Sequence, residues 1–204
     1  NEKLAAVVVA NLKKHFFDAH YCATIDEARN LALSMIPAGS SVGWGGAAAI
    51  DAIGLKDALR AGDYTLVDRD LAESPEERVE ITRKALLTDT FLMGTNAISQ
   101  DGQLVNIDGT GNRLGALIYG PKSVLIVSGM NKVEATLGLA MERAQTIAAP
   151  INAGRFPGST PCRVSGACGH CFQQDSICAQ VVITRFSKPA NRIKVILVNE
   201  DLGF

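Results

Sequence analysis

The sequence predicts a three-layer α/β/α domain whose sheet is mixed and mostly parallel. Helical and extended segments alternate along the 204 residues, which is typical of repeated βα units. Apolar residues make up 47% of the chain and charged residues 20%, a composition that suits a globular protein with a sizeable core. Hairpin-like segments around Gly102 and Pro189 add antiparallel strands to this expectation.

Hydrophobic periodicity and capping residues set the expected elements. Thr24 with Glu27 and Ser74 with Glu77 have the spacing of helix starts, and Gly54 should divide one helical segment in two. The expected helices span residues 1–15, 24–35, 47–60, 74–87 and 133–148. The expected strands span residues 17–23, 41–44, 64–67, 90–94, 97–99, 104–107, 123–128, 181–185 and 193–198.

The charge balance gives no reason to expect nucleic acid as a partner, since 20 Lys and Arg face 21 Asp and Glu. The densest basic stretch surrounds Pro189 and is expected to be a solvated hairpin loop; its residues are Arg185, Lys188, Arg192 and Lys194. No apolar run approaches the roughly 18 residues of a membrane span, and the first helix is amphipathic, unlike a signal peptide. The sequence therefore predicts a cytoplasmic protein with no membrane partner.

A glycine-rich segment, residues 41–47, joins an expected strand to an expected helix. Such a loop can turn backbone N–H groups toward an anion, with Gly45 and Gly46 allowing close approach and Trp44 covering the ligand. The alternative is a tight turn with Trp44 packed at the sheet edge. The motif matches neither the dinucleotide fingerprint nor the P-loop.

Polar residues follow three of the expected strands, at the end where ligands collect in open α/β sheets. Arg113 and Lys132 would suit a carboxylate or phosphate, which predicts a pocket for a small anionic ligand. The alternative is that Asn, Asp and Gly only form turns here. The predicted ligand-binding residues are Trp44, Gly45, Gly46, Asn96, Gly109, Gly111, Asn112, Arg113, Asn131 and Lys132.

No nucleophile–base pair is evident in the sequence. For acid–base catalysis Asp108 is the first candidate and Asp101 the second. Asp108 would equally suit a turn or a role in holding another ligand-binding side chain.

Residues 150–180 are rich in Pro, Gly and Cys, and we expect them to form an irregular, cysteine-rich appendage of a single domain spanning residues 1–204. Four of the five cysteines lie there in the spacing C-x5-C-x2-C-x6-C: Cys162, Cys168, Cys171 and Cys178. Four thiolates in a short loop predict a metal site, either zinc or an iron–sulfur cluster. The alternatives are two disulfides or free thiols. The remaining Cys22 is expected in the core.

Several segments resemble the lactate-utilization (LUD) domain family over nearly the whole chain. The segments that carry the resemblance are residues 41–46, 95–113, 119–122, 129–132 and 198–204. The resemblance implies a fold related to ribose-5-phosphate isomerase, coenzyme A transferases and 5-formyltetrahydrofolate cyclo-ligase. It also implies an association with bacterial lactate oxidation beside iron–sulfur and flavin partner proteins, which favours a cluster over zinc at the cysteines.

The chain departs from the family pattern at two places. Gln100 stands where many LUD sequences and coenzyme A transferases carry a glutamate, and an amide cannot form an acyl anhydride. The cysteine cluster is absent from the simplest LUD proteins. The expected function is therefore a redox-linked enzyme or accessory subunit of lactate-like organic-acid metabolism. The alternatives are a non-enzymatic regulatory subunit with structural zinc, and an isomerase or transferase of the related fold; a homo-oligomer is consistent with each.

Overall fold

The structure is a computed structural model that describes residues 1–204. Its main sheet has six strands, all parallel, in the order β1-β10-β7-β4-β2-β3. These strands are β1 (Asp18–Cys22), β2 (Ser41–Trp44), β3 (Thr65–Val67), β4 (Thr90–Met93), β7 (Ser123–Gly129) and β10 (Ile193–Val198). Because every strand runs the same way, the loops that follow them emerge at one edge of the sheet.

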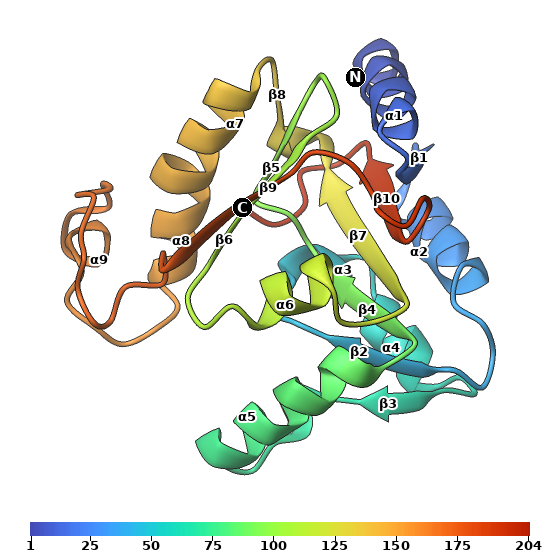
Figure 1. Cartoon of the computed structure of the whole chain (residues 1–204), viewed down its shortest axis with the longest axis horizontal. Helices are drawn as coiled ribbons and strands as arrows, with labels where there is room; N and C mark the ends of the chain where they lie inside the picture. Colours follow the sequence, from blue (N-terminus) through green and yellow to red (C-terminus); the bar gives the residue numbers. More distant parts are fainter.

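Helices cover both faces of this sheet (Figure 1). Side chains alternate along β7: Val124 and Ile126 belong to one core cluster, and Leu125 and Val127 belong to the other. The first cluster includes residues of α1 (Glu2–Lys14) and α6 (Asn112–Ile118). The second includes residues of α2 (Ile25–Ser34), α3 (Ala48–Ala52) and α4 (Leu55–Arg60). The predicted three-layer α/β/α architecture is confirmed.

The antiparallel strands form a second, mixed sheet in the order β8-β5-β6-β9. Its strands are β8 (Val133–Glu134), β5 (Ala97–Ser99), β6 (Leu104–Asp108) and β9 (Gln180–Thr184). Gly102 turns the β5–β6 hairpin with φ +90°, and a Cβ there would lie 2.8 Å from the backbone of Asn11. A small core between this sheet and a continuous helical segment includes Ala97, Val105 and Ala144. That segment comprises α7 (Leu137–Arg143), a π-helical turn (Ala144–Ala148) and α8 (Ala149–Ala153).

The expected helix starts are present in the structure. The Thr24 hydroxyl accepts a hydrogen bond from the backbone of Glu27 at 3.2 Å, and Ser74 caps α5 (Pro75–Lys84) in the same way. Gly54, with φ +68°, separates α3 from α4 as predicted. The short helices η1 (Arg69–Leu71), η2 (Ala85–Leu87), η3 (Met130–Lys132) and α9 (Pro161–Ser165) complete the element list.

The prediction of one helix over residues 133–148 is wrong at both ends. Val133 and Glu134 instead form β8 beside β5, and Thr136 caps a helix that starts at Leu137. The helical segment then continues through Pro150, which lies in the first turn of α8, directly after the π-helical turn.

The predicted hairpin around Pro189 is also wrong. β9 pairs with β6 in the small sheet, whereas β10 lies between β1 and β7 in the main sheet. Nor are all the basic residues of this stretch merely solvated. The Arg192 guanidinium donates to the carbonyls of Ala116, Leu117 and Pro121, and Lys194 donates to the carbonyl of Met35.

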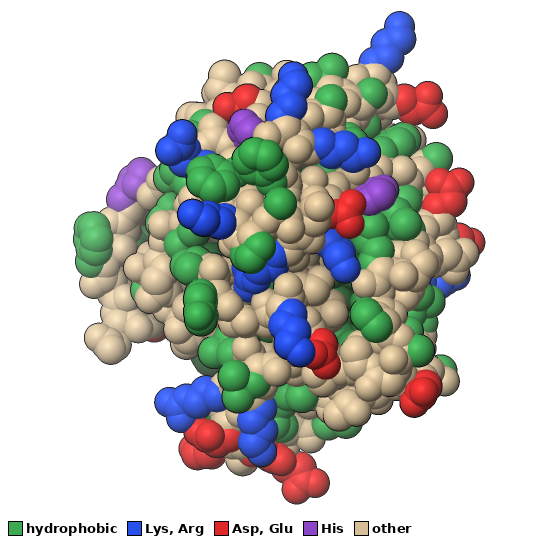
Figure 2. All heavy atoms as spheres, turned by 45° about the vertical axis from the view of Figure 1, so that its right-hand side comes forward, with side chains coloured by type: hydrophobic (Ala, Val, Ile, Leu, Met, Phe, Trp, Pro, Cys, Tyr) green, Lys and Arg blue, Asp and Glu red, His purple; other side chains and the backbone are tan.

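None of the helices combines the length and the apolar character that a membrane crossing would require. The face drawn in Figure 2 carries both acidic and basic side chains, with apolar ones between them.

Arg192 therefore has a structural role that can be measured. Replacing it (Arg192→Met) leaves two carbonyls in the last turn of α6, and that of Pro121 after it, without their charged donor. We expect the free energy of unfolding to fall by about 2–4 kcal/mol in urea denaturation. Arg185 is exposed, so Arg185→Met should change it by less than about 0.5 kcal/mol. Equal effects of the two substitutions would contradict this assignment.

Candidate functional site

A cavity of about 920 Å³ opens where the parallel strands end. Its wall includes Gly46 after β2, Thr95 and Asn96 after β4, Lys132 after β7 and Gly203 after β10. These four strands are neighbours in the main sheet, so their loops meet at one place. Loops after β3 and β6, Arg78 of α5, the end of α8 with the residues up to Pro157, and residues 171–179 of the cysteine-rich segment provide most of the remaining wall.

Lys132 is a buried residue of the cavity wall, and only 4% of its surface is exposed to solvent. Its Nζ donates a hydrogen bond to the carbonyl of Thr95 at 3.1 Å and has no carboxylate partner. Burial lowers the pKa of Lys132 to about 8, with further lowering by the nearby Arg143 and Arg113. Gly203 packs so closely that a Cβ there would lie 2.9 Å from Nζ.

Arg143 holds the loops that carry this lysine and Asn96. From α7, its guanidinium donates to the carbonyl of Asn131 at 3.1 Å and to that of Asn96 at 2.8 Å. The Asn131 side chain in turn binds the backbone of Leu202 and Gly203. Asn131 was a predicted ligand-binding residue, but it does not line the cavity and instead positions the segment after β10.

Arg113 and Asp108 form one unit in the cavity wall. Asp108 accepts from the backbone N–H of Arg113 at 3.0 Å and from its Nε at 3.3 Å, and both side chains are 11% exposed. Arg113 also donates through Nη2 to the carbonyl of Ile107 at 2.6 Å. Both carboxylate oxygens of Asp108 thus hold Arg113, the arrangement expected of a positioning residue, and Asp108 itself lines the cavity, so its catalytic role stays a prediction.

The glycine-rich loop, residues 41–47, was predicted to turn backbone N–H groups toward an anion, and the structure gives Gly45 a different role. The backbone N–H of Gly45 donates to the carbonyl of Leu92, and a Cβ on Gly45 would lie 2.4 Å from Cγ of Arg113. Gly45 is therefore needed as room for the Arg113 side chain. Gly46 does line the cavity, but α3 behind it has only five residues and provides a weak dipole.

Trp44 does not cover a ligand. It is fully buried in the second core cluster, and its Nε1 donates to Asp70 at 3.0 Å. Lys56 and Arg60 lie over its ring at 5.6 and 5.8 Å from the centroid. Trp44 thus anchors the charged network beside the cavity and takes no part in the wall.

Some of the remaining predicted site residues line the cavity, and others lie outside it. Asn96, Gly109 and Asn112 line the cavity, and the Asn112 amide nitrogen is buried there without a hydrogen-bond partner. Gly111, with φ +78°, precedes α6 and is not part of the wall. Asp101, the second catalytic candidate, lies outside the cavity in the β5–β6 turn, where it accepts from Ser99.

Three arginines in the wall were not predicted: Arg69, Arg78 and Arg155. Arg69 lies two residues after Val67, the last residue of β3, so the rule that found Lys132 applied to it as well. Arg155 lies in the irregular segment after α8, where no periodic pattern marks it. The polar wall thus carries five cationic side chains but only Asp108 and Asp175 as carboxylates.

Comparison with known proteins identifies the family. A sequence model described as the LUD domain matches residues 5–198. The chain belongs to the LUD domain family. Its fold resembles a DUF162 family protein from Deinococcus radiodurans, with 13% identity, 97% of each chain covered and a TM-score of 0.55.

Partial similarities to this LUD chain are more distant. Ribose 5-phosphate isomerase A from Neisseria gonorrhoeae has 17% identity over 56% of each chain, with a TM-score of 0.35. Subunit eIF2B beta from Chaetomium thermophilum has 15% identity over 56% of this chain and 44% of its own, with a TM-score of 0.40. No protein of curated function matches the chain significantly.

Two further features of the LUD chain, Gln100 and the four-cysteine loop, can be located in the structure. Gln100 does not line the cavity; its carbonyl accepts a hydrogen bond from Asn11 of α1.

All four cysteines of the C-terminal loop are free and partly exposed, and Cys171 and Cys178 line the cavity. Burial raises the pKa of Cys178, and the neighbouring thiols of Cys162, Cys168 and Cys171 raise it further. No group of three or more His, Cys, Asp or Glu is arranged to hold a metal ion.

The buried Lys132 predicts a specific pH dependence of stability. Its folded pKa of about 8 lies below the ordinary value of 10.5, so the unfolded chain binds more protons between these pH values. The free energy of unfolding contributed by this group therefore rises as pH increases through that window. At pH 7, Lys132→Met should stabilise the protein by about 2–3 kcal/mol, and this gain should vanish near pH 10.5.

The measurement is urea denaturation of both proteins at several pH values. Lys122 is 86% exposed, so Lys122→Met should show no such pH-dependent difference. A Lys132→Met gain that stays constant across the window would contradict the buried, charged lysine.

Proposed function

We propose that this LUD protein binds a small organic anion, a carboxylate or a phosphate, in the cavity at the strand ends. The observation that carries this proposal is the environment of Lys132. Its ammonium is nearly fully buried, and it has a single neutral carbonyl as a hydrogen-bond partner. Leaving a buried charge unpaired is costly, and an anion in the cavity would remove that cost.

The rest of the wall supports the same ligand class. Arg113 is held in place by Asp108, and the free amide nitrogen of Asn112 offers a further donor. The excess of cations over carboxylates favours negative charge throughout the cavity. Its volume, about 920 Å³, is that of a site for a small molecule.

We place this binding in redox-linked metabolism of lactate-like organic acids, since the chain is a LUD domain. The wall offers groups that bind and orient an anion, and Asp108 is engaged with Arg113. Iron–sulfur or flavin partner proteins would then supply the electron transfer. A coenzyme A transferase reaction through Gln100 is disfavoured, because Gln100 is an amide that lies away from the cavity.

Binding of L-lactate and of inorganic phosphate tests the proposed function. Each is titrated into the whole chain and followed by NMR chemical shifts. Lys132→Met should weaken binding at least about 10-fold, because it removes the unpaired ammonium. Lys122→Met keeps the affinity unchanged, since Lys122 is exposed beside Asp89. Unchanged binding by Lys132→Met, or no binding by the native chain, would contradict the proposal.

A second candidate function concerns the four-cysteine loop, which we propose as a site for an iron–sulfur cluster or zinc. The support is that four cysteines lie within one short loop, and that the thiols of Cys162, Cys168 and Cys171 lie near enough to Cys178 to raise its pKa. Thiolates are the preferred donors of both groups. As placed, the thiols do not form a ligand set, so binding would have to draw them together. A cluster would carry electrons, whereas zinc would stabilise the loop of a non-enzymatic accessory subunit.

The metal content of protein purified without oxygen distinguishes these roles. Iron at several atoms per chain indicates a cluster, and about one zinc per chain indicates a structural site. Cys171→Ser should remove most of the metal in either case, whereas Cys22→Ala should keep it, because Cys22 lies in the second core cluster. Finding neither metal would rule the candidate out.

A further inference from the structure

We propose that Arg69 and Arg78 form a second anion subsite in this cavity, so that the ligand carries two anionic groups. The inference rests on the proposed function, in which Lys132 and Arg113 hold the first group. Both new arginines line the cavity, Arg69 from η1 and Arg78 from α5.

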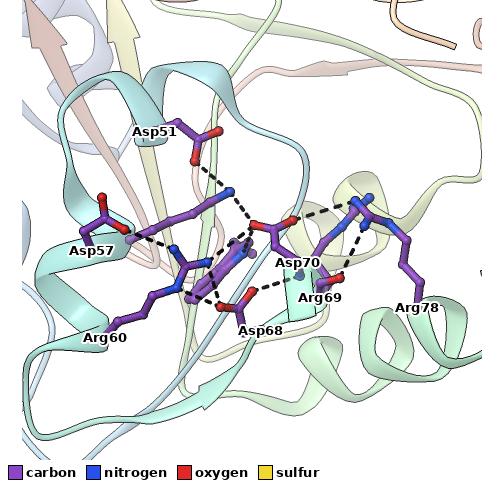
Figure 3. A network of polar contacts seen from close by, with 9 residues as sticks. Asp51, Asp57, Arg60, Asp68, Arg69, Asp70 and Arg78 are labelled. Atoms are coloured by element: carbon purple, nitrogen blue, oxygen red, sulfur yellow. Dashed lines mark hydrogen bonds and ion pairs between the residues drawn. The ribbon is translucent and has the colours of Figure 1, made fainter. Parts of the chain in front are cut away.

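The carboxylates on either side of Arg69 are already engaged elsewhere. Asp68 accepts two hydrogen bonds from Arg60, at 2.9 and 2.8 Å, and one from the backbone of Asp70. Asp70 accepts from Lys56 at 2.8 Å and from Trp44 at 3.0 Å. Burial alone would raise the pKa of Asp70, but these donors lower it, so the carboxylate stays ionised. Figure 3 shows this network, with Asp70 between Arg60 and Arg78.

Arg69 itself has no partner for its side chain. Its guanidinium makes no ion pair, and its Nε is buried without a hydrogen bond. Burial lowers the pKa of Arg69, and the neighbouring Arg78 lowers it further. Asp70 lies beside this pair, and Asp70 and Asp108 partly offset the repulsion between the two guanidinium groups. Asp70 is already shared by Lys56, Trp44 and Arg78, so a bound anion would supply the hydrogen-bond partner that the Arg69 side chain lacks.

Two contacts with η1, the short helix that contains Arg69, hold Arg78 of α5 beside it. Its Nη1 donates to the carbonyl of Arg69 at 3.3 Å, and its Nη2 lies 3.7 Å from Asp70 (Figure 3). The Arg78 side chain is 45% exposed and lines the cavity, so these contacts do not close it off. The pair is therefore positioned by the protein before any ligand arrives.

The two subsites are separate but adjacent. In the sheet order β7-β4-β2-β3, Lys132 follows β7 and Arg69 follows β3, and the Arg113 side chain packs against Gly45 at the end of β2. This order places Arg113 between the two ends of a row of cations. A ligand with anionic groups joined by a short carbon chain fits such a row, and the second group is a phosphate or a carboxylate, both of which pair with guanidinium.

The test compares L-lactate, succinate and 3-phospho-D-glycerate as probes of the whole chain. Succinate and phosphoglycerate carry two anionic groups, and lactate carries one. We expect at least one of the two to bind at least about 10-fold more tightly than lactate. A preference for phosphoglycerate identifies the second group as phosphate, and a preference for succinate identifies it as carboxylate.

Variants locate the second group. Arg69→Gln should reduce the affinity of the preferred probe to that of lactate and leave lactate binding unchanged. Arg78→Gln is an independent variant with the same expected effect, and melting temperatures verify that both fold. Arg83→Gln is the matched control, because Arg83 lies on the same helix, is 70% exposed and pairs with Glu80.

The outcomes separate the two proposals. Equal affinity for all three probes, or loss of lactate binding in Arg69→Gln, overturns the second subsite. Lactate binding that depends on Lys132 then still supports the proposed function. If no probe binds the native chain, both proposals fail.

Discussion

The parallel arrangement of the main sheet is the constraint on which the site depends. Since all six strands run in one direction, the loops after β2, β4, β7 and β10 must emerge side by side. Residues distant in sequence, such as Gly46 and Lys132, therefore share one cavity. Arg143 from α7 then fixes two of these loops through backbone carbonyls, so the position of the lysine does not rely on the loops alone.

The cationic wall is a source of instability in the free protein. Lys132 is withdrawn from water without a carboxylate partner, and Arg69 is half-buried without an ion pair; burial lowers the pKa of both. Core packing in the three clusters has to offset this cost. A ligand that supplies the missing negative charge binds the folded state only, so it would stabilise the protein as it fills the cavity. Instability of the free site and affinity for an anion thus have the same origin.

Local sequence patterns could predict which residues follow the buried strands, but not which strands pair with one another. Polar residues after buried strands led to Asn96 and Lys132, because the ends of the parallel strands β4 and β7 converge. Arg113 was also found by this rule, although it follows β6 of the second sheet, which the sequence did not separate from the main one. The hairpin at Pro189 could not be judged locally, since β9 and β10 find their partners in different sheets. Trp44 was placed over a ligand, although it shares the strand face of Val42, two residues earlier, and both are buried in one cluster.

The cysteine loop connects the two proposed activities. Cys171 and Cys178 belong to the cavity wall, together with the segment between them, so a metal that drew the four thiols together would reshape the place where the anion binds. Binding at two coupled sites is reciprocal: if metal changes the affinity for the anion, the anion changes the affinity for metal by the same factor. The appendage that looked separate in the sequence is therefore part of the site, and the metal content of a preparation has to be known before its ligand affinity can be interpreted.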